Sequence, residues 1–130
     1  MLDRSDIKEI LAKFNESDNQ RELLIKKSRD VLKLSKQLIY SLHREDLEAA
    51  KSLSSEIKKS FHELSTIASK NPELKYSGSY KISGQEYVEA MCYYGFVAEN
   101  RLPTHKELQV DHNAYLAGLC DLQESWSGRP

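Results

Sequence analysis

The sequence has few of the residues that interrupt helices, with five glycines and three prolines among 130 residues. Because Gly and Pro are the strongest local breakers of regular structure, their scarcity favours long helices. No apolar run approaches the length of about 20 residues that a membrane-spanning helix needs. With 30% charged residues and a mean hydropathy of -0.63, the composition argues against a membrane protein. Leu, Ile and Val recur along the whole chain, which argues against a disordered polar chain.

Cysteine is also scarce, and Cys92 and Cys120 have no Cys or His neighbour at metal-ligand spacing. We therefore predict two buried, reduced thiols. The first ten residues, MLDRSDIKEI, contain acids and lack the apolar segment of a secretory signal. Together these features predict a cytoplasmic, reducing location.

Neither sign of charge predominates, since 19 basic side chains balance 20 acidic ones. Residues 1–70 contain 14 basic and 12 acidic side chains, and residues 71–130 contain 5 and 8. Neither part is basic enough to predict nucleic-acid binding from charge alone.

Apolar residues at helical spacing predict a long first helix over residues 5–43, with Ser5 as its N-cap and a possible loosening near Ser17. Its inward stripe consists of Leu24, Val31, Leu38 and Leu42. A second amphipathic helix is predicted over residues 46–69, ending before Pro72. Because only a short corner joins them, the two helices should be antiparallel neighbours.

The second half is also predicted to be helical, after a polar connection over residues 73–83. A helix over residues 85–100 should place Val88 on its apolar face and Glu89 on nearly the opposite one. Thr104 and Glu107 form a capping box, and the last helix starts near Asp111. No strand pattern occurs, so we predict an all-α bundle.

The end of the chain, WSGRP, is an unusual continuation for a helix whose Tyr115, Leu119, Leu122 and Trp126 should point inward. We expect a helical domain over residues 1–122, incomplete at its C-terminus. Residues 123–130 are then an atypical tail, truncated or frame-shifted.

Two carboxylates, Glu86 and Glu89, lie three residues apart on one predicted helix. Like charges at this spacing repel each other. A Mg²⁺ or Mn²⁺ ion that bridged the two carboxylates would replace this repulsion with attraction, because hard cations prefer oxygen ligands. Asp121 on the last helix could supply a third ligand. Phosphodiester hydrolysis fits such a metal site. The alternative is that all three are ordinary surface carboxylates.

Tyrosines and lysines are interleaved around the polar connection, where Lys75 precedes Tyr76 and Lys81 follows Tyr80. Aromatic rings beside lysines can stack the bases of a single strand. Core packing of a tyrosine-rich helix, which also contains Tyr87, Tyr93 and Tyr94, is the alternative. The four histidines, His43, His62, His105 and His112, fall on separate predicted elements without ligand spacing.

Two segments resemble the translin/trax family. Residues 85–90, QEYVEA, followed by residues 93–96, YYGF, are similar to the signature of the family's third helix, and residues 113–122, NAYLAGLCDL, to that of its fifth. The order of the predicted helices also fits over residues 5–122. The details are closer to trax-like and archaeal members than to translin itself.

The resemblance implies an antiparallel helical bundle that assembles into a hollow oligomer and binds single-stranded RNA or DNA. The assembly would be a homo-oligomer or a hetero-oligomer with a translin-like subunit. Trax-type subunits are Mg²⁺-dependent endoribonucleases whose acids line the interior. Glu86 and Glu89 match the paired glutamates of the third helix, and Asp121 matches the aspartate of the fifth.

Two acids of the family pattern are not matched, because Ser83 and Ser125 stand in their places and Glu124 is one residue out of register. Family chains also continue through two further helices. Without these helices an apolar face would be exposed, so we expect self-association rather than a clean monomer. The alternative function is a non-catalytic interaction or scaffold subunit of an oligomer that pairs through Ile25, Leu32 and Ile39.

Overall fold

The computed structural model describes residues 3–127, and side chains through Glu124. Its helices are α1 (Arg4–His43), α2 (Leu47–Ser69), the 3₁₀ helix η1 (Pro72–Tyr76), α3 (Gly78–Glu99), the short α4 (His105–Leu108) and α5 (His112–Ser127). The described residues contain no strand, which confirms the all-α prediction. None of their helices is long and apolar enough to cross a membrane. The last three residues of the predicted tail lie outside the described range, and α5 continues through the tail to residue 127.

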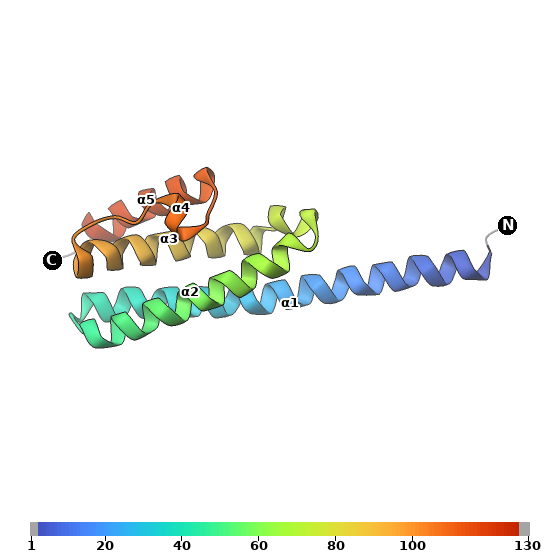
Figure 1. Cartoon of the computed structure of the whole chain (residues 1–130), viewed down its shortest axis with the longest axis horizontal. Helices are drawn as coiled ribbons and strands as arrows, with labels where there is room; N and C mark the ends of the chain where they lie inside the picture. The colour runs from blue at the N-terminus through green and yellow to red at the C-terminus, as the bar shows by residue number, and fades with distance from the viewer. Residues whose placement is uncertain (1–2, 128–130) are drawn as a thin grey trace.

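The helices form a bundle around α3 (Figure 1). The α1 and α2 helices are an antiparallel pair, as predicted, and α3 packs against both of them. Residues 100–111 run back along α3, so α5 packs against α3 in the same chain direction (Figure 1). The first half of α1 extends well beyond the other helices (Figure 1).

The predicted inward stripe of α1 is confirmed, because Leu24, Val31, Leu38 and Leu42 are all buried. Serines alternate with these apolar residues on the buried side of the helix. Their small side chains let α3 approach closely, and Ser83 Oγ of α3 donates a hydrogen bond to the carbonyl oxygen of Ser28 at 3.2 Å. Ser35 Oγ is satisfied within its own helix by the Val31 carbonyl oxygen at 2.8 Å. The hydroxyl bonds of Ser83 and Ser35 reduce the cost of burying polar atoms.

Two details of the first helix differ from the prediction. The N-cap is Asp3 instead of Ser5, because the Asp3 carboxylate accepts both the backbone N–H and the hydroxyl of Ser5. The helix also continues through Ser17 without a break. The polar segment there contains no Gly or Pro, so nothing in the backbone ends the helix.

The third helix begins at Gly78, seven residues before the predicted start. Ser77 caps it by accepting a hydrogen bond from the Tyr80 N–H at 3.3 Å. A glycine inside a helix costs only about 1 kcal/mol, which a good cap and tertiary packing offset. Gly84 lies at such a packed position, where an added Cβ would be 3.6 Å from Ala114 Cβ of α5.

The one-sided burial predicted for the third helix is wrong. Every residue from Tyr87 to Gly95 is buried, including Glu89 on the supposed solvent face, while Ala98 is exposed. The reason is that α3 contacts α1, α2 and α5 and so has neighbours on several sides. The thiol prediction is half right: both cysteines are free, but only Cys92 is buried, since Cys120 lies on the exposed side of α5.

Candidate functional site

The predicted carboxylates lie on α3 and α5. Glu86 is half-buried, and Glu89, one turn later on α3, is only 6% exposed. Asp121 is half-buried on α5. A buried carboxylate is costly unless other groups satisfy it, which makes Glu89 the least ordinary of the three.

A very close approach of α5 to α3 sets the position of Asp121. An added Cβ at Gly118 would lie 2.5 Å from Val88 Cγ1 and 2.9 Å from the Gln85 carbonyl oxygen. Only glycine allows this spacing without displacement of one helix. Asp121 follows Gly118 by one turn, so it belongs to the helix that packs directly beside the carboxylates of α3.

The three carboxylates are on packed helices but are not gathered into one ligand group. Among the residues that the structure describes, no three Asp, Glu, His or Cys side chains are placed to hold a metal ion together. Their oxygen atoms are the ligands that Mg²⁺ and Mn²⁺ prefer. At the first unmatched family position, the Ser83 hydroxyl donates to the carbonyl oxygens of Ser79 and Ser28. The side chain of Ser125 lies outside the described part of the chain.

A second group of predicted residues lines one cavity of about 340 Å³, which we call the Lys–Tyr cavity. It lies between Phe61 of α2, η1, the start of α3 and the start of α5. All four of the predicted nucleic-acid-binding residues line it, namely Lys75, Tyr76, Tyr80 and Lys81. Polar side chains also reach it from the facing helices, among them Gln85 and Asn113.

The aromatic rings of this cavity differ in exposure. Tyr76 is 77% exposed, and Lys81 Nζ lies 6.0 Å from the centre of its ring. Tyr80 is half-buried and stacks on Phe61 with ring centres 6.4 Å apart. The free ring of Tyr76 has an accessible face beside a cation, whereas Phe61 anchors Tyr80 to the core.

The remaining tyrosines of α3 belong to the core, as the alternative interpretation predicted. Tyr87, Tyr93 and Tyr94 are all buried. Tyr87 stacks on Phe61 with ring centres 4.1 Å apart, and burial raises the pKa of Tyr87 to about 12. The tyrosine cluster therefore divides into a cavity pair and a core group.

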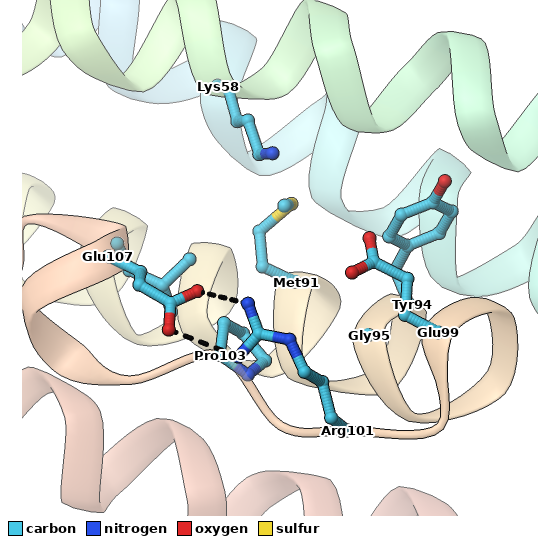
Figure 2. A pocket seen from close by; sticks show the side chains of 9 residues that line it. Lys58, Met91, Tyr94, Gly95, Glu99, Arg101, Pro103 and Glu107 are labelled. Atoms are coloured by element: carbon cyan, nitrogen blue, oxygen red, sulfur yellow. Dashed lines mark hydrogen bonds and ion pairs between the residues drawn. The ribbon is translucent and has the colours of Figure 1, made fainter.

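A smaller cavity of about 80 Å³ lies where residues 100–108 fold back on α3 (Figure 2). Figure 2 shows the Arg101 guanidinium joined to the Glu107 carboxylate by two hydrogen bonds, of 3.1 and 2.6 Å, with Lys58 of α2 on the opposite side. These bonds lower the pKa of Glu107. The cavity is too small for a nucleotide, and the Arg101–Glu107 pair beside it joins two parts of the α3–α5 connection.

The capping box predicted at Thr104 is present, and Arg101 shares its carboxylate. Thr104 Oγ1 accepts a hydrogen bond from the Glu107 N–H at 3.2 Å, as expected of the cap. The Glu107 carboxylate also accepts a hydrogen bond from the Thr104 backbone, as predicted, but its main partner is Arg101. A charged partner gives a stronger hydrogen bond than a neutral backbone amide, so Arg101 is the larger influence on this carboxylate.

Sequence reasoning missed a contact between two histidines. His105 at the start of α4 and His112 at the start of α5 have ring centres 4.5 Å apart, and Tyr115 lies 6.0 Å from His105. The two histidines are on different helices, as predicted, but the fold of the connection brings them together. Their spacing in the sequence gives no signal of this contact.

Comparison with known proteins agrees with the resemblance. The chain is 31% identical over 107 residues to the uncharacterized protein MJ0175 of Methanocaldococcus jannaschii, an alignment that covers 81% of this chain and 47% of that protein. It also superposes on the crystal structure of apo-NeC3PO with a TM-score of 0.86 and 31% identity, covering 96% of this chain and 65% of that one. The chain thus spans about half the length of its curated relative. Residues 19–125 match the profile of the Translin family, and the chain therefore belongs to this family.

Proposed function

We propose that this chain is a single-stranded nucleic-acid-binding subunit and that it binds the strand at the Lys–Tyr cavity. The observation that supports this most directly is the exposed ring of Tyr76, flanked by Lys75 and facing Lys81 at the rim of the cavity. Stacking of one base on an aromatic ring contributes about 1–3 kcal/mol and does not depend strongly on sequence. The lysines would neutralise neighbouring phosphates.

The size and polarity of the cavity support this function. A volume of about 340 Å³ lies near the lower end of the range of about 300–1,000 Å³ for small-molecule sites. It therefore suits one base better than a folded duplex. The side chains of Gln85 and Asn113 supply hydrogen-bonding groups for the edge of a base that stacks on Tyr76.

We further propose that Glu86, Glu89 and Asp121 serve metal-dependent cleavage of RNA, with Mg²⁺ or Mn²⁺ as the ion. When bound, the ion would polarise a phosphoryl oxygen and lower the pKa of a coordinated water. Two observations support this role: Glu89 is a buried carboxylate, and Glu86 directly follows Gln85, which lines the Lys–Tyr cavity. A strand bound in the cavity would therefore contact the same helix that carries Glu86 and Glu89.

A non-catalytic binding or scaffold subunit is the second candidate. The observation that favours it is Ser83, which occupies an acid position of the family pattern with its hydroxyl already bonded to backbone carbonyls. A serine hydroxyl in this arrangement is a poor substitute for a carboxylate ligand. Such a subunit would bind RNA but would not cleave it.

The test of binding is a titration of 5′-labelled single-stranded RNA. Tyr76→Ala should weaken binding about tenfold or more, because it removes one stacked base. Tyr40→Ala is the matched control, since Tyr40 is also exposed and lies 4.8 Å from a cation, Arg44, but outside the cavity. Equal effects of the two substitutions would refute the assignment of the cavity.

The lysines are tested by salt dependence. Replacing Lys75 and Lys81 with Gln should lower the slope of log affinity against log salt by about 1.4, since each phosphate contact on a single strand contributes about 0.7. An unchanged slope would show that Lys75 and Lys81 do not contact the phosphates of the strand.

The same titration in Mg²⁺, Mn²⁺ and EDTA tests cleavage. Cleavage that requires metal and disappears in a Glu86→Gln/Glu89→Gln variant, with binding retained, would support the nuclease. Binding without cleavage in either metal would favour the second candidate. Cleavage that is unchanged in the variant would refute the roles of both glutamates.

A further inference from the structure

A second cavity, which the proposed function does not use, adjoins the Lys–Tyr cavity. Its volume is about 240 Å³, and it lies between α2, α3 and the short α4. We call it the Lys–His cavity, and its main lining residues are Lys58, His62, Ser65, Tyr87, Leu108 and Gln109. Small-molecule sites typically have volumes of about 300–1,000 Å³, so this smaller cavity suits one chemical group of a larger ligand.

The two cavities share a wall. The ring of Phe61 lines both of them, and it stacks on Tyr80 of the Lys–Tyr cavity and on Tyr87 of the Lys–His cavity. Consecutive residues of the α3–α5 connection also divide between them, because Gln109 lines the Lys–His cavity and Val110 lines the Lys–Tyr cavity. Consecutive Cα atoms are about 3.8 Å apart, close to the rise of about 3.4 Å per nucleotide along one strand of DNA. A strand in the Lys–Tyr cavity therefore reaches the Lys–His cavity with a nearby nucleotide.

One face of α2 supplies most of the polar groups of the Lys–His cavity. Lys58, His62 and Ser65 are spaced by four and then three residues, which places them on the same side of the helix. The ammonium, the imidazole and the hydroxyl can all donate hydrogen bonds, and the Gln109 amide adds a donor from the connection. Phosphate oxygens accept hydrogen bonds, and lysine, serine and glutamine are among the side chains that contact phosphates in nucleic-acid complexes.

The charges of this cavity favour an anion. Among the described residues that line it, the one acid is Glu107, and its carboxylate accepts two hydrogen bonds from Arg101. Lys58 forms no ion pair with any described residue. Figure 2 shows its side chain extending from α2 toward the connection. The Glu107 charge is thus balanced by Arg101, and the Lys58 ammonium is left for a ligand.

The hydroxyl of Ser65 is the least expected feature of the cavity. Its Oγ is buried and has no hydrogen-bond partner within the described part of the chain. By contrast, Ser54, Thr66 and Ser69 of the same helix each donate to a carbonyl oxygen one turn earlier. A buried hydroxyl without a partner costs free energy. A ligand oxygen that accepts from Ser65 would remove this cost.

We propose that the Lys–His cavity binds a phosphate of the strand whose base stacks on Tyr76 in the Lys–Tyr cavity. This inference rests on the proposed binding function and adds a second point of contact to it. Lys58 donates a charged hydrogen bond to the phosphate, and His62 and Ser65 donate two more. The second contact does not depend on base sequence, because it is made to the backbone of the strand.

Ser65→Ala separates a role in binding from a role in folding. Removing an unpartnered buried hydroxyl should leave the free energy of unfolding unchanged or raise it. The affinity for 5′-labelled single-stranded RNA should fall about tenfold, because a hydrogen bond to a charged phosphate is lost. Ser69→Ala is the matched control, since its hydroxyl is exposed and bonds within its own helix, and it should not change binding. Equal RNA affinities of Ser65→Ala and the wild-type chain would overturn the proposal.

Lys58→Gln tests the charge of the site. The slope of log affinity against log salt should fall by about 0.7, the contribution of one phosphate contact on a single strand. Lys59→Gln is the control, because Lys59 is also an exposed lysine of α2 but lines a different groove, between α1 and α2. It should leave the slope nearly unchanged. Equal changes in the two variants would show that only the general charge of α2 matters, which would contradict a site at the Lys–His cavity.

Comparison with Tyr76→Ala distinguishes this inference from the function on which it rests. If Tyr76→Ala weakens binding but Lys58→Gln and Ser65→Ala do not, the strand binds at the Lys–Tyr cavity and the second contact is wrong. If none of the three variants weakens binding, both proposals fail. If only Lys58→Gln and Ser65→Ala weaken it, a phosphate binds without the stacked base, and the link between the two cavities is refuted.

Nuclear magnetic resonance of His62 distinguishes a phosphate of the strand from the free anion. Single-stranded RNA should shift the imidazole resonances of His62, which are assigned by their loss in His62→Gln. Inorganic phosphate at the same concentration and ionic strength should shift them much less, because it lacks the contacts at the Lys–Tyr cavity. Resonances that RNA leaves unmoved would overturn the proposal. So would a full shift by inorganic phosphate that RNA does not change, since that result would identify a site for the free anion.

Discussion

The N-terminal arm, which is residues 4–22 of α1, and α3 are helical segments of similar length, but the arm is exposed and α3 is buried. The arm exposes Phe14 to solvent, whereas α3 buries even the carboxylate of Glu89. The arm has fewer apolar residues than α3, and their packing differs as well, because α3 has neighbours on several sides and the arm has none within the described chain. The comparison shows that helical periodicity identifies an apolar edge without showing what covers it.

The largest effect is expected when one aromatic side chain from each region is replaced and the free energies of unfolding are compared. Tyr93→Ala in α3 should lower the free energy of unfolding by about 4 kcal/mol, because it removes a fully buried ring from the core. Phe14→Ala in the arm should change it by less than about 0.5 kcal/mol at protein concentrations where copies are separate. Urea unfolding monitored by circular dichroism measures both, and similar losses would contradict the distinction.

The contact between α3 and α5 is tested by adding one methyl group. Gly118→Ala places a Cβ 2.5 Å from Val88 Cγ1, so the helices must move apart, and we expect a loss of about 2 kcal/mol. Gly78→Ala is the control, since an added Cβ there has no neighbour within 4 Å. It should be neutral or slightly stabilising. If the two variants unfold at the same urea concentration, α5 does not pack on α3 as described.

Alkaline pH should lower the free energy of unfolding, because α3 buries a thiol and a phenol that ionise at high pH. Burial raises the pKa of Cys92 to about 11 and that of Tyr87 to about 12, from ordinary values of 9.0 and 10.0. Between the ordinary and the raised values the folded state keeps a proton that the unfolded state has lost. The free energy of unfolding should therefore be unaffected by these groups below about pH 9 and should fall between about pH 9 and 12.

Two substitutions check the origin of this pH dependence. In urea titrations across that range, Cys92→Ala should remove the lower part of the decline and Tyr87→Phe the upper part. A decline unchanged in both variants would assign it to other groups.

The prediction with the smallest expected effect compares the reactivity of the two thiols. Cys120 is exposed and should react readily with a thiol reagent at pH 8. Cys92 is buried with a raised pKa, so little thiolate forms and it should react only after unfolding. Counting modified thiols by mass spectrometry over time distinguishes them. Two thiols with the same fast rate would show that α3 opens more easily than its packing implies.

Local pattern was enough to predict most of the fold. The stripe of α1, the corner before α2 and the cap at Thr104 follow from helical spacing and capping preferences, and the structure confirms them. The start of α3 was not predictable in the same way, because Gly78 and Gly84 indicate a break that is offset by the Ser77 cap and, at Gly84, by packing against α5. The buried position of Glu89 likewise depends on three neighbouring helices.

The same distinction between local pattern and tertiary contacts applies to the candidate site. Sequence alone determined that Glu86 and Glu89 lie one turn apart and that Lys75 and Tyr76 are adjacent, because covalent spacing and helical pitch fix these relations. Only the tertiary structure decided which tyrosines face a cavity, where Asp121 lies relative to α3, and that His105 meets His112. Those relations depend on how the α3–α5 connection folds back, and that path is determined by contacts between residues distant in the sequence.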